Sequence, residues 1–174
     1  MIKFLLTAFC LGLLAISPAA IAQSVEQKLT GMGLVLPAPT KSAGNYVKAV
    51  RTGNLMFLAG HISSRADGST ITGKLGKDLT VEQGYEAAKA ASVSLLSTLK
   101  AELGDLGRIR RIVKVTGFVN SMPDFTDQPK VINGCSDLLV ALLGDKGKHA
   151  RSAVGMVALP LNAAVEIELV VEVE

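Results

Sequence analysis

The stretch that decides the fold is VEIELVVEVE, residues 165–174. Its odd-numbered positions are all apolar, and four of its five even-numbered positions are glutamate. Because successive side chains of a strand point to opposite faces, this pattern predicts a strand with Ile167, Leu169, Val171 and Val173 against a core and the glutamates on the other face. A strand of this kind suits a sheet that is covered on one face only.

Strand patterns also occur upstream of this stretch. Residues 46–51 and 54–62 predict a hairpin, residues 108–120 are rich in β-branched side chains, and one more strand precedes residue 165. The segment between the hairpin and the next element, residues 63–78, is rich in Ser, Gly, Asp and Lys, and we expect an exposed excursion there.

Two helices separate these strands. Thr80 and Gln83 have capping-box spacing and predict a helix that runs to Gly104, with many alanines and serines that allow close packing on a sheet. Pro129 opens a second apolar-periodic segment that ends at Gly144. The order ββαβαββ predicts a single α+β domain with a mostly antiparallel sheet and both helices on one face.

The other face of this sheet is left bare by the predicted arrangement. We expect Met56, Leu58 and Val154 to add apolar area there. An uncovered apolar face favours self-association.

The N-terminal residues 1–22 have the pattern of a secretory signal: Lys3, an apolar run at 4–16, and Ala20-Ile21-Ala22 as a small-x-small cleavage site. We expect cleavage before Gln23 and a periplasmic or secreted protein that no longer contacts the membrane. An uncleaved anchor is the alternative, although the apolar run is shorter than the roughly 20 residues that span a bilayer. Residues 23–44 are expected to form an arm before the domain.

Composition argues against several classes of function. The chain has 18 Lys and Arg against 15 Asp and Glu, and loss of Lys3 with the signal leaves a net charge of +2. With no Trp and two Tyr, this balance does not predict a nucleic-acid binder. Cys10 lies in the signal, so Cys135 alone remains and no intrachain disulfide can form. No metal site is predicted, because His149 has no partner at metal-ligand spacing.

A set of short motifs from about Asn45 to Glu174 resembles the Rid family, also called YjgF or endoribonuclease L-PSP proteins. In chain order they are Asn45-Tyr46-Val47, Leu58-Ala59-Gly60-His61, Gly117-Phe118-Val119-Asn120, Phe125 with Asn133, Ala150-Arg151-Ser152, Leu159-Pro160 and Val165-Glu166-Ile167-Glu168. The resemblance implies a Rid-like domain over residues 45–174 with the chorismate-mutase-like fold. It also implies a homotrimer with three clefts between subunits.

The function implied by the resemblance is hydrolysis of small reactive enamines and imines, such as 2-aminoacrylate and 2-iminopropanoate, to a 2-keto acid and ammonia. No cofactor is implied. Two alternatives stay open: a non-enzymatic trimeric envelope protein that binds a small carboxylate or acts as a chaperone, and an endoribonuclease.

The resemblance assigns catalytic roles to three residues. Arg151 would clamp the substrate carboxylate, which a guanidinium does through two parallel hydrogen bonds. Glu166 would orient water, and Tyr46 would donate to substrate or water. The alternatives are an Arg151 that pairs with a glutamate across the sheet, a solvated Glu166, and a half-buried Tyr46 with a wet hydroxyl.

Substrate binding is assigned by the same resemblance to Gly60, His61, Asn133 and Ser152. Asn133 could equally be an ordinary helix-face residue. Two positions depart from the family pattern: Ala59 stands where a serine is common, and Ala153 stands where many members carry cysteine. His61 replaces a common glutamine and could assist proton transfer near neutral pH.

Overall fold

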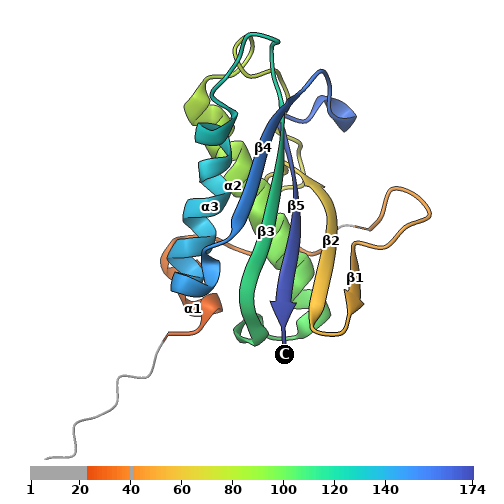
Figure 1. Cartoon of the computed structure of the whole chain (residues 1–174), viewed down its shortest axis with the longest axis vertical. Helices are drawn as coiled ribbons and strands as arrows, with labels where there is room; N and C mark the ends of the chain where they lie inside the picture. The colour runs from red at the N-terminus through yellow and green to blue at the C-terminus, as the bar shows by residue number, and fades with distance from the viewer. Residues whose placement is uncertain (1–22, 40) are drawn as a thin grey trace, which may run out of the picture.

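The strand predicted from residues 165–174 lies in the middle of the sheet. The computed structural model describes residues 23–39 and 41–174, so the predicted signal at 1–22 lies outside the described residues. Five strands form one sheet in the order β1-β2-β5-β3-β4 (Figure 1). Their bounds are β1 Ala49–Thr52, β2 Leu55–Ile62, β3 Ile109–Asn120, β4 Ala150–Met156 and β5 Val165–Val173.

All strand pairs are antiparallel except β3 with β4, which is parallel. The α2 helix (Val81–Leu103) and the α3 helix (Gln128–Leu143) cover the same face of the sheet, here called the helix face (Figure 1). Apolar residues of β5 that point to this face, among them Ile167 and Val171, are fully buried. The predicted α+β fold is therefore confirmed, and the opposite face is called the outer face below.

The two long helices begin and end where their sequences predicted. Thr80 caps α2 through the capping box with Gln83, and Gly104 ends it with φ of 77°. Pro129 lies in the first turn of α3. The two helices approach closely because Gly134 lies against the backbone carbonyl of Tyr85, where a Cβ would have no room.

The face assignment of β2 was wrong. Met56 and Leu58 were expected on the bare face, but both are buried on the helix face, paired with Val171 and Leu169 of β5. Phe57 lies on the outer face instead and is 44% exposed. Every residue from 55 to 59 is apolar, so the alternation that fixed the orientation of β5 is missing from β2.

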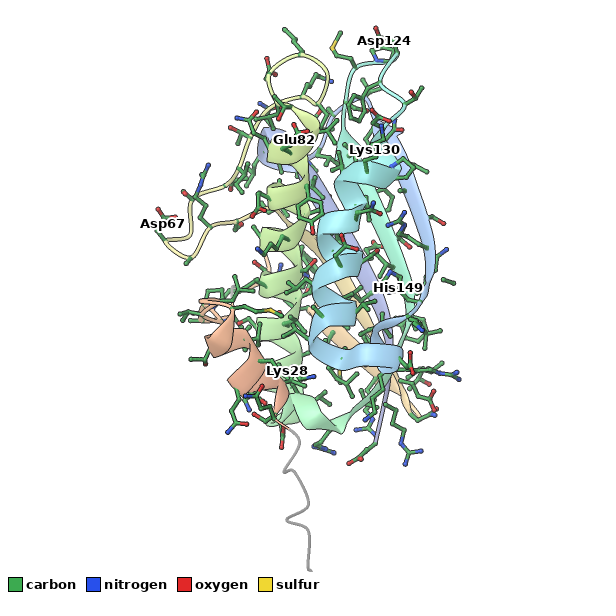
Figure 2. The ribbon with its side chains drawn as sticks, turned by 90° about the vertical axis from the view of Figure 1, so that its left-hand side faces the viewer. Lys28, Asp67, Glu82, Asp124, Lys130 and His149 are labelled. Atoms are coloured by element: carbon green, nitrogen blue, oxygen red, sulfur yellow. The ribbon has the colours of Figure 1, made fainter. Side chains whose placement is uncertain are left out.

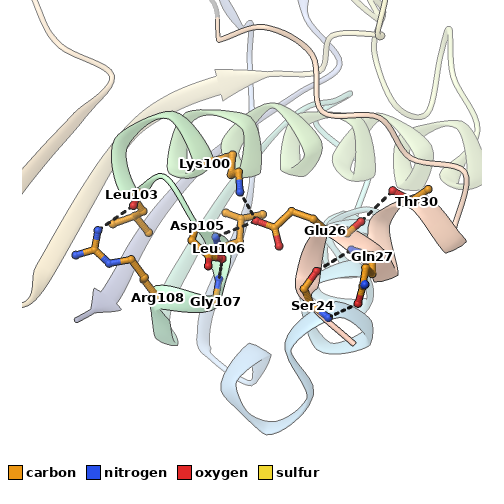
Figure 3. A network of polar contacts seen from close by, with 10 residues as sticks. All are labelled: Ser24, Glu26, Gln27, Thr30, Lys100, Leu103, Asp105, Leu106, Gly107 and Arg108. Atoms are coloured by element: carbon orange, nitrogen blue, oxygen red, sulfur yellow. Dashed lines mark hydrogen bonds and ion pairs between the residues drawn. The ribbon is translucent and has the colours of Figure 1, made fainter. Parts of the chain in front are cut away.

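The arm expected at residues 23–44 contains a helix, α1 (Val25–Gly31), that the sequence analysis did not predict. Ser24 and Gln27 form a capping box, and the Glu26 carboxylate accepts from Lys100 Nζ at 2.6 Å and from Leu106 N–H at 3.2 Å (Figure 3). These contacts anchor α1 to the end of α2 and to the short helix η1 (Leu106–Arg108) that follows it.

The excursion at residues 63–78 is only partly exposed. Leu75 is 0% exposed, and its backbone donates to Asn120 O at 2.8 Å and accepts from Met122 N–H at 3.0 Å. This segment therefore packs over the end of β3. Across residues 23–39 and 41–174, none of the helices has the length and apolar character that a membrane span requires.

Candidate functional site

Arg151 lies on the edge strand β4 and points to the helix face. In the parallel pairing of β4 with β3 its partner is the buried Val115, which shares that face. The Arg151 Nη1 group donates to Asn133 Oδ1 at 2.8 Å and to Ser136 Oγ at 3.0 Å, both on α3. The structure thus brings together Arg151 and Asn133, which lie 18 residues apart in the sequence.

The alternative in which Arg151 pairs with a glutamate does not fit the chain. In the part that the structure describes, no ion pair involves Arg151. Glu172, on the outer face, pairs with a different arginine: its carboxylate accepts from Arg111 Nε at 2.8 Å. Within the described residues, Arg151 is therefore held by neutral acceptors and has no carboxylate partner.

The hydrogen bonds of Arg151 continue to a residue pair that sequence reasoning missed. His149 Nε2 lies 3.0 Å from Ser136 Oγ, and His149 Nδ1 lies 2.6 Å from Gly147 O. Figure 2 places His149 beside α3, where the chain leads into β4. Spacing could have pointed to Ser136, because residues three apart on a helix, such as Asn133 and Ser136, lie on the same side.

Glu166 lies on the outer face, where β5 pairs it with Ile62 of β2 and Phe118 of β3. A Cβ on Gly60 would overlap the Glu166 carboxylate, so glycine is the residue that lets the carboxylate lie over the β2 backbone. The approach occurs at an irregularity in the register of β2 with β5, between Leu58 and His61. The structure thus places Gly60 and Glu166 side by side.

Burial raises the pKa of the Glu166 carboxyl above its ordinary value, and the neighbouring charge of Glu168 raises it further, while Lys48 opposes them. A half-buried carboxyl with a raised pKa is better suited to exchange protons near neutral pH than an exposed one. On the same face, a hollow of about 330 Å³ is lined by residues that include Val47, Ala59 and Glu168.

Tyr46 precedes β1, in the part of the predicted strand 46–51 that the structure leaves outside the sheet. Its side chain is 47% exposed, with Lys48 Nζ 5.8 Å from the ring centroid. Its role at the cleft stays a prediction.

His61 does not occupy the position expected of a substrate-binding residue. The ring is 4% exposed and points to the helix face, where Nε2 lies 2.8 Å from Thr98 Oγ1 of α2 and Nδ1 lies 2.7 Å from Ala59 O. Glu166 is on the opposite face, because His61 pairs with Ile167 and its neighbour Ile62 pairs with Glu166. The prediction that His61 binds substrate or assists proton transfer is therefore wrong. Its ring joins β2 to α2 through Thr98 and has a structural role.

Ser152 follows Arg151 and points to the outer face, since neighbours on a strand alternate. Its hydroxyl accepts from Lys114 Nζ at 2.8 Å.

The chain carries two groups of site residues. The Arg151 group consists of Arg151, Asn133, Ser136 and His149 on the helix side of β4, and the Glu166 group consists of Glu166 and Gly60 on the outer face.

One chain does not bring the two groups together. Strand β3 lies between β4 and β5, and Arg151 and Glu166 point to opposite faces of the sheet. Within the described residues no cluster of three or more His, Cys, Asp or Glu could hold a metal ion. The chemistry available to these groups is the binding of an anion by Arg151 and proton exchange by Glu166.

Comparison with protein families settles the relationship that the motifs suggested. The model of the YjgF/chorismate mutase-like endoribonuclease family matches residues 26–173. The chain belongs to this family. The match extends over α1 as well as the sheet and the two long helices, so the N-terminal helix lies within the family region.

Three similar proteins show how the chain compares with known sequences and structures. Protein TCP17 of Trypanosoma cruzi is 44% identical over 149 residues, which cover 85% of this chain and 93% of that protein. A 2-iminobutanoate/2-iminopropanoate deaminase of Dermatophagoides farinae is 28% identical and covers 79% of this chain and 93% of its own length. A crystal structure of an Agrobacterium tumefaciens protein of unknown function is 42% identical, covers 87% of this chain and 94% of its own, and superposes with a TM-score of 0.80.

Proposed function

We propose that the protein is a hydrolytic deaminase that converts small 2-imino or 2-enamino carboxylates, of the 2-iminopropanoate type, to 2-keto acids and ammonia. Membership of a family that includes a 2-iminobutanoate/2-iminopropanoate deaminase supports this proposal. The single observation that carries it is an arginine held by the neutral acceptors of Asn133 and Ser136 and free of any carboxylate partner in the described chain.

Arg151 supplies the binding energy for the substrate carboxylate. A guanidinium and a carboxylate form two parallel charge-assisted hydrogen bonds, each contributing about 1.5 to 3 kcal/mol. Because no glutamate or aspartate of the described residues pairs with Arg151, the substrate carboxylate does not have to displace an internal partner.

Glu166 supplies the proton transfers. Water adds to the imine carbon and forms the new C–O bond while Glu166 takes a proton from it. The proton is returned to the nitrogen, which gives a carbinolamine. Glu166 then takes the proton of the new hydroxyl and passes it to the nitrogen as the C–N bond breaks, so that the carbonyl of the 2-keto acid forms and ammonia leaves. The raised pKa of Glu166 brings this carboxyl closer to the working pH, which favours both steps.

Assembly of three copies is part of the proposal, because Arg151 and Glu166 lie on opposite faces of one chain. A second copy that packs its edge strand β4 against the outer face would bring the Arg151 group of one subunit to the Glu166 group of another. The exposed apolar side chains of Val50, Phe57 and Val154 on the sheet favour such burial.

The test is ammonia release from 2-iminopropanoate generated in the assay, compared with its spontaneous hydrolysis. We expect Arg151→Ala to lower kcat/KM by about 100-fold or more, since two charge-assisted bonds are lost. Glu166→Gln should lower kcat with KM largely kept. The matched controls are Arg110→Ala and Glu102→Gln, which change exposed residues of β3 and α2.

Sedimentation of the wild type at micromolar concentration accompanies this assay. Trimers that bind pyruvate but do not accelerate ammonia release would contradict the deaminase and favour the carboxylate-binding alternative. A monomer with full activity would contradict the shared cleft.

A further inference from the structure

Arg151 uses only part of its hydrogen-bonding capacity within the described chain. A guanidinium has five N–H bonds, of which Nη1 carries two. Both Nη1 hydrogens have partners, Asn133 Oδ1 and Ser136 Oγ. No residue in the described chain accepts from Nε or Nη2, so these two groups form the fork that a carboxylate can meet side-on.

The direction of the hydrogen bonds around Ser136 follows from the histidine beside it. Gly147 O can only accept, so His149 Nδ1 carries the ring hydrogen of the neutral imidazole. His149 Nε2 therefore accepts, and the Ser136 O–H donates to it. The lone pairs of Ser136 Oγ are then turned toward Arg151 Nη1, which donates to them.

The charged groups around His149 favour the neutral ring. Burial lowers the pKa of His149, and the positive charge of Arg151 lowers it further. On the preceding turn Lys148 pairs with Asp145 at 2.7 Å, and Lys146 Nζ donates to Ile109 O at 3.4 Å. On α3, Asp137 accepts from Tyr85 OH, and on β3, Lys114 donates to Ser152 at the outer face.

We infer that Ser136 and His149 are positioning residues for carboxylate binding, a chain of hydrogen bonds that fixes Nη1 of Arg151 and thereby presents its Nε/Nη2 fork to the substrate. This inference rests on the proposed function for its substrate class and adds two residues to the site. Neither residue touches the substrate. Residues of this kind orient a binding group much as outer partners orient metal ligands, and their loss weakens binding more than chemistry.

The experiment uses three variants of the full protein. We expect Ser136→Ala and His149→Leu to raise KM for 2-iminopropanoate about tenfold with kcat within about twofold of wild type, because uniform binding is lost. We expect His149→Gln to stay within about twofold of wild type in KM, since its side-chain oxygen accepts where Nε2 does. A merely structural histidine would instead lower the stability of His149→Leu and leave the KM of the folded protein unchanged.

A direct binding measurement keeps the inference independent of turnover. Calorimetric titration with pyruvate should show the same order of affinities, with Ser136→Ala and His149→Leu weakened and His149→Gln retained. The matched control is Ser94→Ala on α2, whose hydroxyl donates to Ala90 O of its own helix. Thermal unfolding of each variant reports whether it is folded at the assay temperature.

The outcomes separate this inference from the proposed function. Absence of ammonia release together with the expected order of pyruvate affinities would overturn the deaminase and support the positioning role. Normal ammonia release with unchanged KM in Ser136→Ala and His149→Leu would overturn the positioning role alone. Failure of the wild type to bind pyruvate at millimolar concentration would overturn both.

Discussion

His61 and His149 share one hydrogen-bond pattern in two regions of the molecule. Each ring places Nδ1 against the carbonyl oxygen two residues earlier in the chain, at 2.7 Å and 2.6 Å. Each places Nε2 against a hydroxyl from a covering helix, Thr98 of α2 at 2.8 Å and Ser136 of α3 at 3.0 Å. In both, the carbonyl fixes the neutral tautomer and Nε2 accepts the hydroxyl hydrogen.

The two regions differ in what lies beyond the hydroxyl. Thr98 is 3% exposed and His61 is 4% exposed, so this pair is sealed between β2 and α2. Ser136 and His149 are half-buried, and Ser136 also accepts from Arg151. The same local pattern thus holds a helix on the sheet in one region and orients a charged group in the other. The next contact along the chain of hydrogen bonds decides the role.

The His61–Thr98 pair and the His149–Ser136 pair should differ most in how much they contribute to the free energy of unfolding. We expect His61→Leu to lower the free energy of unfolding by about 2 kcal/mol, because the buried Thr98 hydroxyl loses its acceptor. His149→Leu should cost less than about 1 kcal/mol, since Ser136 is accessible to water. Urea unfolding followed by circular dichroism measures both.

A double variant checks the cause of the His61 effect. Adding Thr98→Val to His61→Leu removes both polar partners and should recover part of the lost stability, since no buried hydroxyl remains unpaired. Equal destabilisation by His61→Leu and His149→Leu would contradict the division into a sealed pair and an orienting pair.

A smaller effect is expected in the pH dependence of stability. Burial lowers the pKa of both His61 and His149 below the ordinary value of 6.5. The unfolded chain therefore binds protons first as the pH falls, so the histidines' stabilisation is complete above about pH 6.5 and is lost below it. Each histidine contributes a slope of at most about 1.4 kcal/mol per pH unit.

The pH effect is measured by urea unfolding between about pH 7 and pH 5, with His61→Gln and His149→Gln compared with wild type. We expect His61→Gln to flatten the loss of stability more, because its ring is the more buried. Glu166 has the opposite sign, since its raised pKa makes the folded state take up a proton first. That contribution is common to all three proteins and cancels in the comparison. A steeper loss of stability with falling pH in either variant than in wild type would contradict the expected contribution of the histidines.

The fold was predictable where apolar and polar residues alternate along a strand. The β5 stretch has one apolar and one acidic face, so its orientation was predictable, and the capping residues Thr80 and Gly104 marked α2. In β2 the apolar run 55–59 offers both faces to the core, and the choice is made by pairing with β5. The helix α1 carries a capping box at Ser24, but it is short and is stabilised by the distant Lys100 and Leu106.

The candidate site was predictable only as far as family motifs reach. These motifs named Arg151, Asn133, Gly60 and Glu166, and the chain places the first two together and the last two together. They did not name Ser136. Helical spacing places Ser136 on the same side as Asn133, but its contact with Arg151 of β4 depends on how α3 packs against the edge strand. They also misplaced His61, since the register irregularity after Leu58 and the presence of Thr98 opposite it are tertiary features.

The smallest expected effect concerns the charge that each histidine faces. Lys48 lowers the pKa of His61 and Arg151 lowers that of His149, each after burial. We expect Lys48→Met to raise the pKa of His61 and to leave that of His149 unchanged, because removal of one positive charge favours the protonated ring nearby. The chain has two histidines, so proton NMR titration of their ring C–H signals follows both in one sample. In about 1 M salt the difference between Lys48→Met and wild type should shrink, since screening at that ionic strength acts over roughly 3 Å. A shift of the His149 pKa equal to that of His61 would show that the two regions are electrostatically coupled and would contradict the separation drawn between them.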